Sequence, residues 1–209
     1  MFWVSNTIES RKAAVEDEDL QYVTLCQRGE MEAFEVLVER HQKRMLNIAY
    51  RMTGDYDEAC DVTQEAFIAA YKSMKSFKAE AKFSTWLYRI VMNLSKNRLK
   101  QLHGRTTRES LRLDDCGDGR AKETGNPSLV HDGNPGLDME RREREAHVQQ
   151  CVNSLDAEYR EVLVLRDIQG FSYEEIRDIL KVPDGTVKSR LSRARNALKD
   201  CLAKIIGDL

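Results

Sequence analysis

The residues best suited to binding chemistry lie between Phe83 and Lys100, a segment that mixes aromatic, amide and basic side chains and contains no acidic one. At helical spacing six of them share one face: Trp86, Arg89, Asn93, Lys96, Asn97 and Lys100. Cations can follow a phosphate backbone, an aromatic ring can stack on an unpaired base, and amides can pair with base edges. This face therefore predicts binding to single-stranded DNA, although Trp86 and Tyr88 could equally be ordinary core residues.

A second binding surface is predicted in the helix that begins near Thr186. Its polar side combines hydroxyl, amide and basic side chains: Lys188, Ser189, Arg190, Ser192, Arg193 and Asn196. Such a mixture suits the major groove of duplex DNA, where a bidentate arginine–guanine pair discriminates by about 1–3 kcal/mol and other cations hold phosphates. The alternative is a plain helical hairpin with a basic solvent face.

The elements before this helix support the first interpretation. Ser172 and Glu175 have the spacing of a capping box, and Phe171 and Ile176 occupy the positions of a hydrophobic staple. Residues 181–185 then form a turn, because they contain both proline and glycine. The following helix would bury one apolar stripe: Val187, Leu191, Ala194, Leu198, Leu202 and Ile205. Together these signals predict a helix-turn-helix.

The charge distribution agrees with two contacts to a polyanion. The net charge of the 209 residues is only −2, yet residues 81–108 contain no acidic residue, and residues 186–204 contain six basic residues against Asp200. The segment that holds Asp61, Gln64 and Glu65, beside Phe67, is different, since its acids make a poor DNA surface. Physical reasoning leaves it as a solvated surface or as a docking face for a basic protein partner.

Periodicity and composition predict an all-α protein with two small helical domains. The first covers residues 17–103, with helices that begin near Met31, Asp57 and Ser84, the last as a plausible N-cap. Residues 104–136 hold six of the eleven glycines and two of the three prolines, and are expected to form a flexible linker. The helix-turn-helix domain covers residues 137–209. Residues 1–16 form an N-terminal extension without an assigned role.

Several functional classes find no support in the residues. No metal site is predicted, because the five cysteines and four histidines are scattered and no cysteine pair has the C-x-x-C spacing. The cysteines are expected to be small buried thiols, with a redox-sensing thiol as the less favoured interpretation. No cofactor or small-molecule substrate is indicated. The chain shows neither a membrane segment nor a secretory signal, which predicts a cytoplasmic protein without direct membrane insertion.

Four segments resemble the extracytoplasmic-function (ECF) sigma factors of the sigma-70 family. Residues 61–71 resemble the helix of that family that binds core RNA polymerase, and residues 83–90 resemble its strand-opening segment. Residues 93–98 are similar to its −10 reader. Residues 171–195, above all Gly185 to Arg190, resemble its −35 reader. The resemblance covers both predicted domains in the family's order.

The resemblance implies roles that spacing alone does not. The residues implied to contact core RNA polymerase are Asp61, Gln64, Glu65 and Phe67. Those implied to lie at the melted −10 element are Lys78, Lys82, Trp86, Tyr88, Arg89, Asn93, Lys96, Asn97 and Arg98. Those implied to face the duplex −35 element are Thr186, Lys188, Ser189, Arg190 and Arg193. An anti-sigma protein is the expected further partner, and the chain is not expected to be an enzyme.

The chain departs from the family after Phe77, where many relatives have Arg-Gly and this sequence has Lys78-Ala79. Loss of the glycine restricts the backbone of this loop, which the resemblance implies helps to hold a flipped base. The rival interpretation is a stand-alone helix-turn-helix repressor or activator, which would form a dimer and bind palindromic DNA without polymerase. A strand-cutting enzyme is a third possibility, for which no nucleophile with supporting groups is found.

Overall fold

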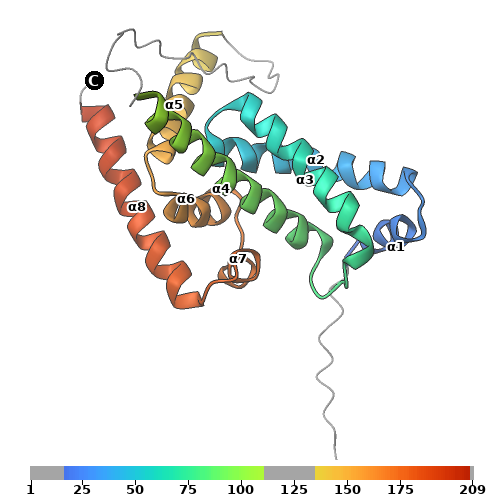
Figure 1. The fold of residues 1–209 in the computed structure, drawn as a ribbon. Coiled ribbons are helices and arrows are strands. Elements are labelled where there is room, and N and C mark those ends of the chain that lie inside the picture. Colours follow the sequence, from blue (N-terminus) through green and yellow to red (C-terminus); the bar gives the residue numbers. More distant parts are fainter. Residues whose placement is uncertain (1–16, 111–134, 208–209) are drawn as a thin grey trace, which may run out of the picture.

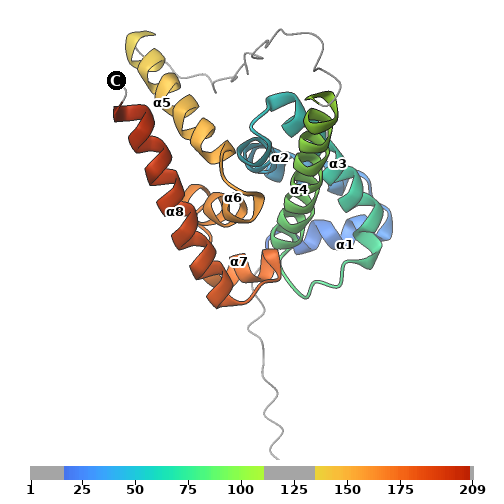
Figure 2. The same ribbon diagram turned by 60° about the vertical axis from the view of Figure 1, so that its left-hand side comes forward.

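The computed structural model describes residues 17–110 and 135–207, and within these ranges every regular element is a helix. One group comprises α1 (Leu20–Arg28), α2 (Glu32–Thr53), α3 (Tyr56–Ser73), the short 3-10 turn η1 (Met74–Ser76) and α4 (Phe83–Ser110). The other comprises α5 (Pro135–Asn153), α6 (Ala157–Leu163), the π-helical turn η2 (Val164–Ile168), α7 (Tyr173–Leu180) and α8 (Asp184–Gly207). Figures 1 and 2 show the two groups packed side by side, with α4 facing α6 and α7. The prediction of an all-α protein is confirmed.

Local signals explain most helix ends of the first group. Gly54 ends α2 with φ +78°, and the side chain of Asp55 accepts a hydrogen bond of 2.9 Å from the backbone N–H of Glu58 at the start of α3. The prediction of Ser84 as the N-cap of α4 was wrong, because the helix begins at Phe83. The N–H of Phe83 instead donates to Asp17, 66 positions away, at 2.8 Å.

Two boundaries differ from the sequence prediction. The prediction missed α1, a short helix with only Val23 and Cys26 buried, because so few apolar positions give a weak helical period. Helix α4 continues to Ser110, past residue 103 where the first domain was expected to end. The predicted extension at residues 1–16 and most of the predicted linker lie outside the described residues.

The second group confirms the predicted helix-turn-helix. Both hydrogen bonds of the Ser172–Glu175 capping box are present, at 2.8 and 3.2 Å. Lys181 ends α7 in the left-handed conformation, with φ +58°, and α8 begins at Asp184. The apolar stripe of α8 is buried at Val187, Leu191 and Ala194. Helix α8 is thereby held with its opposite side exposed.

The two groups share one continuous apolar core. Tyr88 of α4 is 1% exposed, and its ring meets the ring of Phe171 edge-on with centroids 4.8 Å apart. The hydroxyl of Tyr88 accepts a hydrogen bond of 3.2 Å from Arg44. Because the buried cluster includes Leu37 and Leu87 of the first group and Val162 and Ile176 of the second, the described residues form one packed unit.

A buried arginine closes the junction between the groups. The guanidinium of Arg160, in α6, donates to the backbone oxygens of Met52, Asn153 and Leu155, and the residue is only 3% exposed. Met52 lies in the last turn of α2, where helix carbonyls lack partners and where the helix dipole favours a cation. The burial lowers the pKa of Arg160 below its usual range. Its three carbonyl partners join α2 to the turn between α5 and α6.

We predict that Gly54→Ala destabilises the protein more than Gly29→Ala. Both glycines have a positive φ, so each alanine costs about 1–2 kcal/mol in backbone strain. A Cβ at Gly29 meets nothing within 4 Å, whereas one at Gly54 would lie 2.1 Å from the side-chain nitrogen of Asn153 in α5. Urea unfolding of both variants measures the difference, and equal losses of stability would contradict the described contact between α2 and α5.

Candidate nucleic-acid and protein interfaces

The first candidate surface is the exposed side of α4. Asn93, Asn97 and Lys100 are exposed, as the sequence predicted. Trp86 is neither free nor fully buried, since its ring packs on Phe77 and Phe83 with centroid distances of 4.9 and 5.8 Å. This packing fixes the orientation of the indole while part of it remains accessible. The face thus keeps two amides, a cation and part of an aromatic ring available to a nucleic acid.

The loop between η1 and α4 lies beside this face. Lys78 and Lys82 are both exposed, and Gln27 holds the start of the loop by donating to the carbonyls of Met74 and Phe77 at 3.1 and 2.9 Å. Ala79 adopts φ +53°, a left-handed conformation that costs about 1–2 kcal/mol for a residue with a Cβ. The alanine at this position, where the sequence comparison expected glycine, is therefore strained.

Tyr88 does not lie on the exposed face of α4. It follows Trp86 by two residues, or about 200° of helical rotation, so its side chain points toward the second group of helices and is buried there. In the closed arrangement Tyr88 is therefore a contact between the two groups of helices, and its assignment to the −10 surface stays a prediction. The alternative raised from the sequence, that Tyr88 is a core residue, is the one that this packing supports.

Three predicted DNA-binding cations of α4 are already engaged. Arg89 donates to the backbone oxygen of Asp178 in α7 at 2.8 Å, and Lys96 lies 2.9 Å from a carboxylate oxygen of Glu161 in α6. Arg98 contacts Glu58 at 2.7 Å and Glu65 at 2.8 Å, with Asp61 at 3.8 Å. Arg89 and Lys96 therefore bind the second group of helices, and Arg98 binds α3.

The second candidate surface is the exposed side of α8. Lys188, Ser189 and Arg193 are exposed there, and Thr186 is half-buried. The hydroxyl of Ser189 donates to the carbonyl of Thr186 at 3.1 Å. Arg193 lies 3.5 Å from the hydroxyl of Tyr159 but remains on the side opposite the apolar stripe. The start of α8 therefore presents hydroxyl and cationic groups together, as a major-groove helix requires.

Arg190 differs from the other predicted residues of α8. Its guanidinium lies 2.6 Å from Glu158 and 3.3 Å from Glu161, and its side chain is 19% exposed. Three positions separate it from Val187, which places it on the flank of the buried stripe. In this structure Arg190 joins α8 to α6, which differs from the DNA-facing role that the resemblance implied.

Glu161 connects the two candidate DNA surfaces. Its side chain is 3% exposed and lies between Lys96 of α4 and Arg190 of α8. Burial raises the pKa of Glu161 above its usual range, while Lys96 and Arg190 act in the opposite direction. A buried carboxylate is costly without such partners. No local pattern indicated this role, because the three residues come from distant segments.

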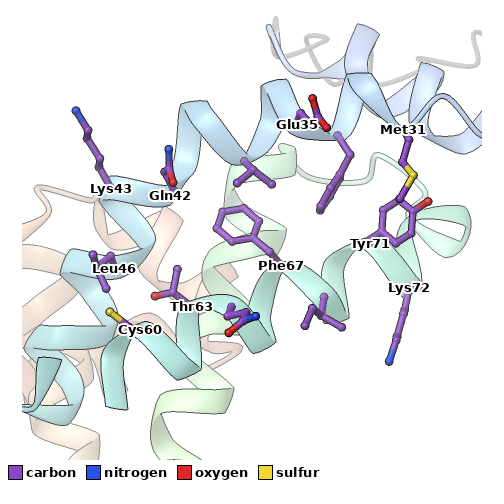
Figure 3. A pocket seen from close by; sticks show the side chains of 14 residues that line it. Met31, Glu35, Gln42, Lys43, Leu46, Cys60, Thr63, Phe67, Tyr71 and Lys72 are labelled. Atoms are coloured by element: carbon purple, nitrogen blue, oxygen red, sulfur yellow. The ribbon is translucent and has the colours of Figure 1, made fainter. Parts of the chain in front are cut away.

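The third candidate surface is a groove between α2 and α3. Figure 3 shows Phe67 and Tyr71 on the α3 side of it, with Leu46 of α2 and Met31, the residue before α2, on the other side. The groove has a volume of about 720 Å³. Met31, Ile68 and Tyr71 remain 64%, 46% and 41% exposed. So much apolar surface left open on neighbouring helices marks a site for a protein partner.

Two of the four predicted polymerase-binding residues line this groove. Gln64 lies in its lining, and Asp61 and Glu65 are 62% and 53% exposed on the same helix. Phe67 is only 8% exposed and forms part of the groove wall. The sequence identified the polar residues and Phe67 but missed Met31, Phe34 and Tyr71. The α2 and α3 segments each looked like ordinary amphipathic helices, and only their packing reveals the shared groove.

The described parts of the chain hold neither a metal cluster nor a membrane span. Within them, no group of three or more His, Cys, Asp or Glu side chains could hold a metal ion. None of their helices is long and apolar enough to cross a bilayer.

We predict that Glu161→Gln loosens the packing of the two helix groups, because a neutral amide would leave Lys96 and Arg190 without their shared anion. The expected result is a larger radius of gyration by small-angle X-ray scattering and tighter binding of single-stranded −10 DNA by the isolated protein. Glu158→Gln is the matched control, since Glu158 is 65% exposed and is paired only with Arg190 within the second group. An unchanged size and affinity in Glu161→Gln would contradict this role.

Comparison with known proteins places both groups of helices in one family. The family model Sigma-70 region 2 matches residues 37–106, and the model Sigma-70, region 4 matches residues 146–198. The RNA polymerase sigma-H factor of Pseudomonas aeruginosa is 36% identical over 195 residues, covering 91% of this chain and 97% of that protein. The ECF RNA polymerase sigma-E factor of Escherichia coli K12 is 36% identical over 188 residues, covering 90% and 96%.

A solved structure shows the same fold. The complex of the sigma factor RpoE with the anti-sigma factor NepR from Bartonella quintana matches with a TM-score of 0.58 and 25% identity. The match covers 82% of this chain and 98% of that chain.

Proposed function

This chain belongs to the ECF sigma factors of the sigma-70 family, and from this premise we propose how its two groups of helices divide promoter recognition between them. The face of α4 that bears Asn93 and Asn97 would capture the melted −10 strand. The face of α8 that bears Lys188, Ser189 and Arg193 would bind the duplex −35 element. The observation that carries this proposal is that each matched region presents its own exposed amide-rich or cationic helix face.

The two kinds of DNA contact differ in chemistry. On α4, the partly exposed Trp86 can stack on an unpaired base, an interaction worth about 1–3 kcal/mol per base. That gain is comparable with the few kcal/mol needed to unstack a base, so the face can hold strands that are already separated. On α8, Arg193 and Lys188 can bind base edges and phosphates of an intact duplex.

The closed arrangement of the structure cannot reach both promoter elements at once. The −35 and −10 elements lie about 25 nucleotides apart, or about 85 Å along B-form DNA. A compact protein of this length has a radius of gyration of about 17 Å and hence a diameter of about 45 Å. The 24 residues between Ser110 and Pro135 reach about 80 Å when fully extended. Promoter recognition therefore requires the two groups of helices to separate.

Core RNA polymerase is the partner proposed to drive this separation. The groove between α2 and α3 offers an apolar floor, and α3 also carries the exposed acids Asp61 and Glu65, which pair with Arg98. This combination suits a helical partner with both apolar and basic side chains. Once both groups are fixed on polymerase, binding of the second DNA element becomes intramolecular and gains effective concentration. Free protein would bind promoter DNA weakly, because its Arg89, Lys96 and Arg190 are engaged internally.

Two further features belong to the proposal. Control by an anti-sigma protein is expected, in line with the complex of RpoE and NepR that shares the fold. The chain is proposed to act in the cytoplasm, where polymerase works, and to contribute no catalysis of its own. Nucleotidyl transfer would belong to polymerase.

Run-off transcription tests the proposal directly. Purified core RNA polymerase is supplied with a genomic promoter library, with and without this protein, and specific transcripts are expected only when both are present. If no promoter responds and the protein alone protects palindromic duplex DNA as a dimer, a stand-alone regulator is the correct function instead.

We predict that Lys188→Ala combined with Arg193→Ala lowers transcription from a −35-dependent promoter roughly tenfold, because a base contact and a phosphate contact are lost. Lys204→Ala is the matched control, since it removes an exposed positive charge from α8 far from the turn. A double variant as active as Lys204→Ala would refute the assignment of this face to the −35 element.

A further inference from the structure

The structure contains a disulfide that the sequence did not predict. Cys151 of α5 and Cys201 of α8 are bonded, with Cα atoms 5.7 Å apart. The sequence favoured small buried thiols, because no C-x-x-C pair occurs and these two cysteines are 50 positions apart. Cys26 and Cys60 are free thiols in the described structure, and Cys116 lies outside it. Cys201 lies beyond residues 146–198, which the family model matches.

The bond encloses the whole promoter-binding motif. The loop that it closes contains α6, η2, α7, the turn and the first three quarters of α8, so α7 and the DNA-facing start of α8 lie inside it. A cross-link stabilises a fold by restricting the unfolded chain, and the effect grows with the length of the closed loop. The helix-turn-helix is therefore the part of the protein whose stability depends most on this bond.

The bond also decides how firmly α5 is held to the helix-turn-helix. Helix α5 contacts the first group through Gln149, which accepts a hydrogen bond of 2.9 Å from Arg51, and through Asn153 beside Gly54. Cys151 lies between these two residues and points the other way, toward α8. With the bond intact, α5 must stay with α8 when the groups separate. Without it, only noncovalent packing holds α5 to α8.

The surroundings allow the bond to be made and broken. Cys151 is fully buried, but Cys201 is half-buried on the exposed end of α8, so a reagent can approach from the side of Cys201. The hydroxyl of Ser154 lies 4.0 Å from the sulfur of Cys201, within reach of a weak hydrogen bond to that sulfur. A protein that works with RNA polymerase acts in a reducing compartment, where disulfides are usually transient. The inference of a reducing compartment rests on the proposed function.

We propose that Cys151 and Cys201 form a reversible thiol–disulfide pair, which stabilises the −35-binding domain when a peroxide oxidises it. The Cys201 thiol would attack hydrogen peroxide, which gives a sulfenic acid and one water. The Cys151 thiol would then displace the hydroxyl group as a second water and form the S–S bond. Both sulfurs together lose two electrons, and the peroxide is reduced to two waters. A dithiol reductant returns both thiols and becomes a disulfide itself.

The first test is thiol trapping on the full chain. The protein is reduced with dithiothreitol, exposed to hydrogen peroxide, alkylated and mapped by peptide mass spectrometry. We expect a Cys151–Cys201 linked peptide after peroxide that disappears again after dithiothreitol. A pair that peroxide leaves reduced, or one that dithiothreitol cannot open in the folded protein, would overturn the proposal.

The second test measures what the bond does. For a closed loop of this length, the oxidised protein should melt roughly 10 °C above the reduced protein. Cys201→Ser should have the melting temperature of the reduced protein under both oxidising and reducing conditions. Cys116→Ser, the matched control for loss of one thiol, should still melt at a higher temperature when oxidised than when reduced. Equal melting temperatures of oxidised and reduced wild type would also refute the proposal.

Transcription separates failure of this proposal from failure of the proposed function. At 25 °C, reduced and oxidised proteins should both support specific transcription with core polymerase, which tests the sigma activity alone. At a temperature between the two melting points, the oxidised protein should give roughly tenfold more −35-dependent transcript than the reduced protein, and Cys201→Ser should lose this difference. Transcription at 25 °C without any redox effect at the higher temperature would refute only the redox pair.

Discussion

The buried guanidinium of Arg160 is the interaction on which the closed structure depends. Placing a cation where only 3% of the residue is exposed costs several kcal/mol unless hydrogen bonds replace its water. Three backbone carbonyls, those of Met52, Asn153 and Leu155, supply these bonds. Since Met52 belongs to α2, while Asn153 ends α5 and Leu155 lies in the turn after it, the guanidinium has all three carbonyl partners only when the two groups of helices meet. The same contact offsets the unpaired carbonyls at the end of α2.

Glu161, the residue after Arg160, links this buried junction to the two candidate DNA-binding surfaces. Glu161 forms ion pairs with Lys96 of α4 and Arg190 of α8. One carboxylate therefore pairs with a cation from each candidate DNA surface. Tyr88 and Phe171 add an apolar contact between α4 and the segment before α7. In the closed form these cations are neutralised inside the protein, whereas promoter phosphates would have to compete for them after the groups separate. Of these two pairs only Lys96–Glu161 joins the two groups, so under the proposed function separation would free Lys96 for DNA.

Local sequence signals were enough to predict the helix-turn-helix and the all-α fold. The capping box at Ser172, the end of the preceding helix at Gly170 and the apolar stripe of α8 each involve neighbours within a few turns, and all three are present. The exposure of Asn93, Asn97, Lys188 and Arg193 also followed from helical periodicity. Such features depend on interactions between residues close together in the chain, so a single sequence is enough to predict them.

Features that join distant segments could not be predicted in this way. Periodicity placed Arg190 with the polar residues, but its partners Glu158 and Glu161 lie about 30 positions away. The burial of Tyr88 depends on Phe171, and the groove between α2 and α3 depends on how two amphipathic helices pack. The Cys151–Cys201 bond spans 50 positions without a recognisable motif. In each case the deciding partner is a tertiary neighbour that no local pattern identifies.

The most direct test of the central claim is the distance between the two groups of helices during initiation. Fluorophores at Glu39 of α2 and Lys199 of α8, both exposed, report this distance by resonance energy transfer. We predict high transfer in the free protein and low transfer once core RNA polymerase and promoter DNA are bound, because the −35 and −10 elements lie about 85 Å apart. High transfer retained in a complex that is actively transcribing would contradict the account, since it would mean that the closed form itself recognises the promoter.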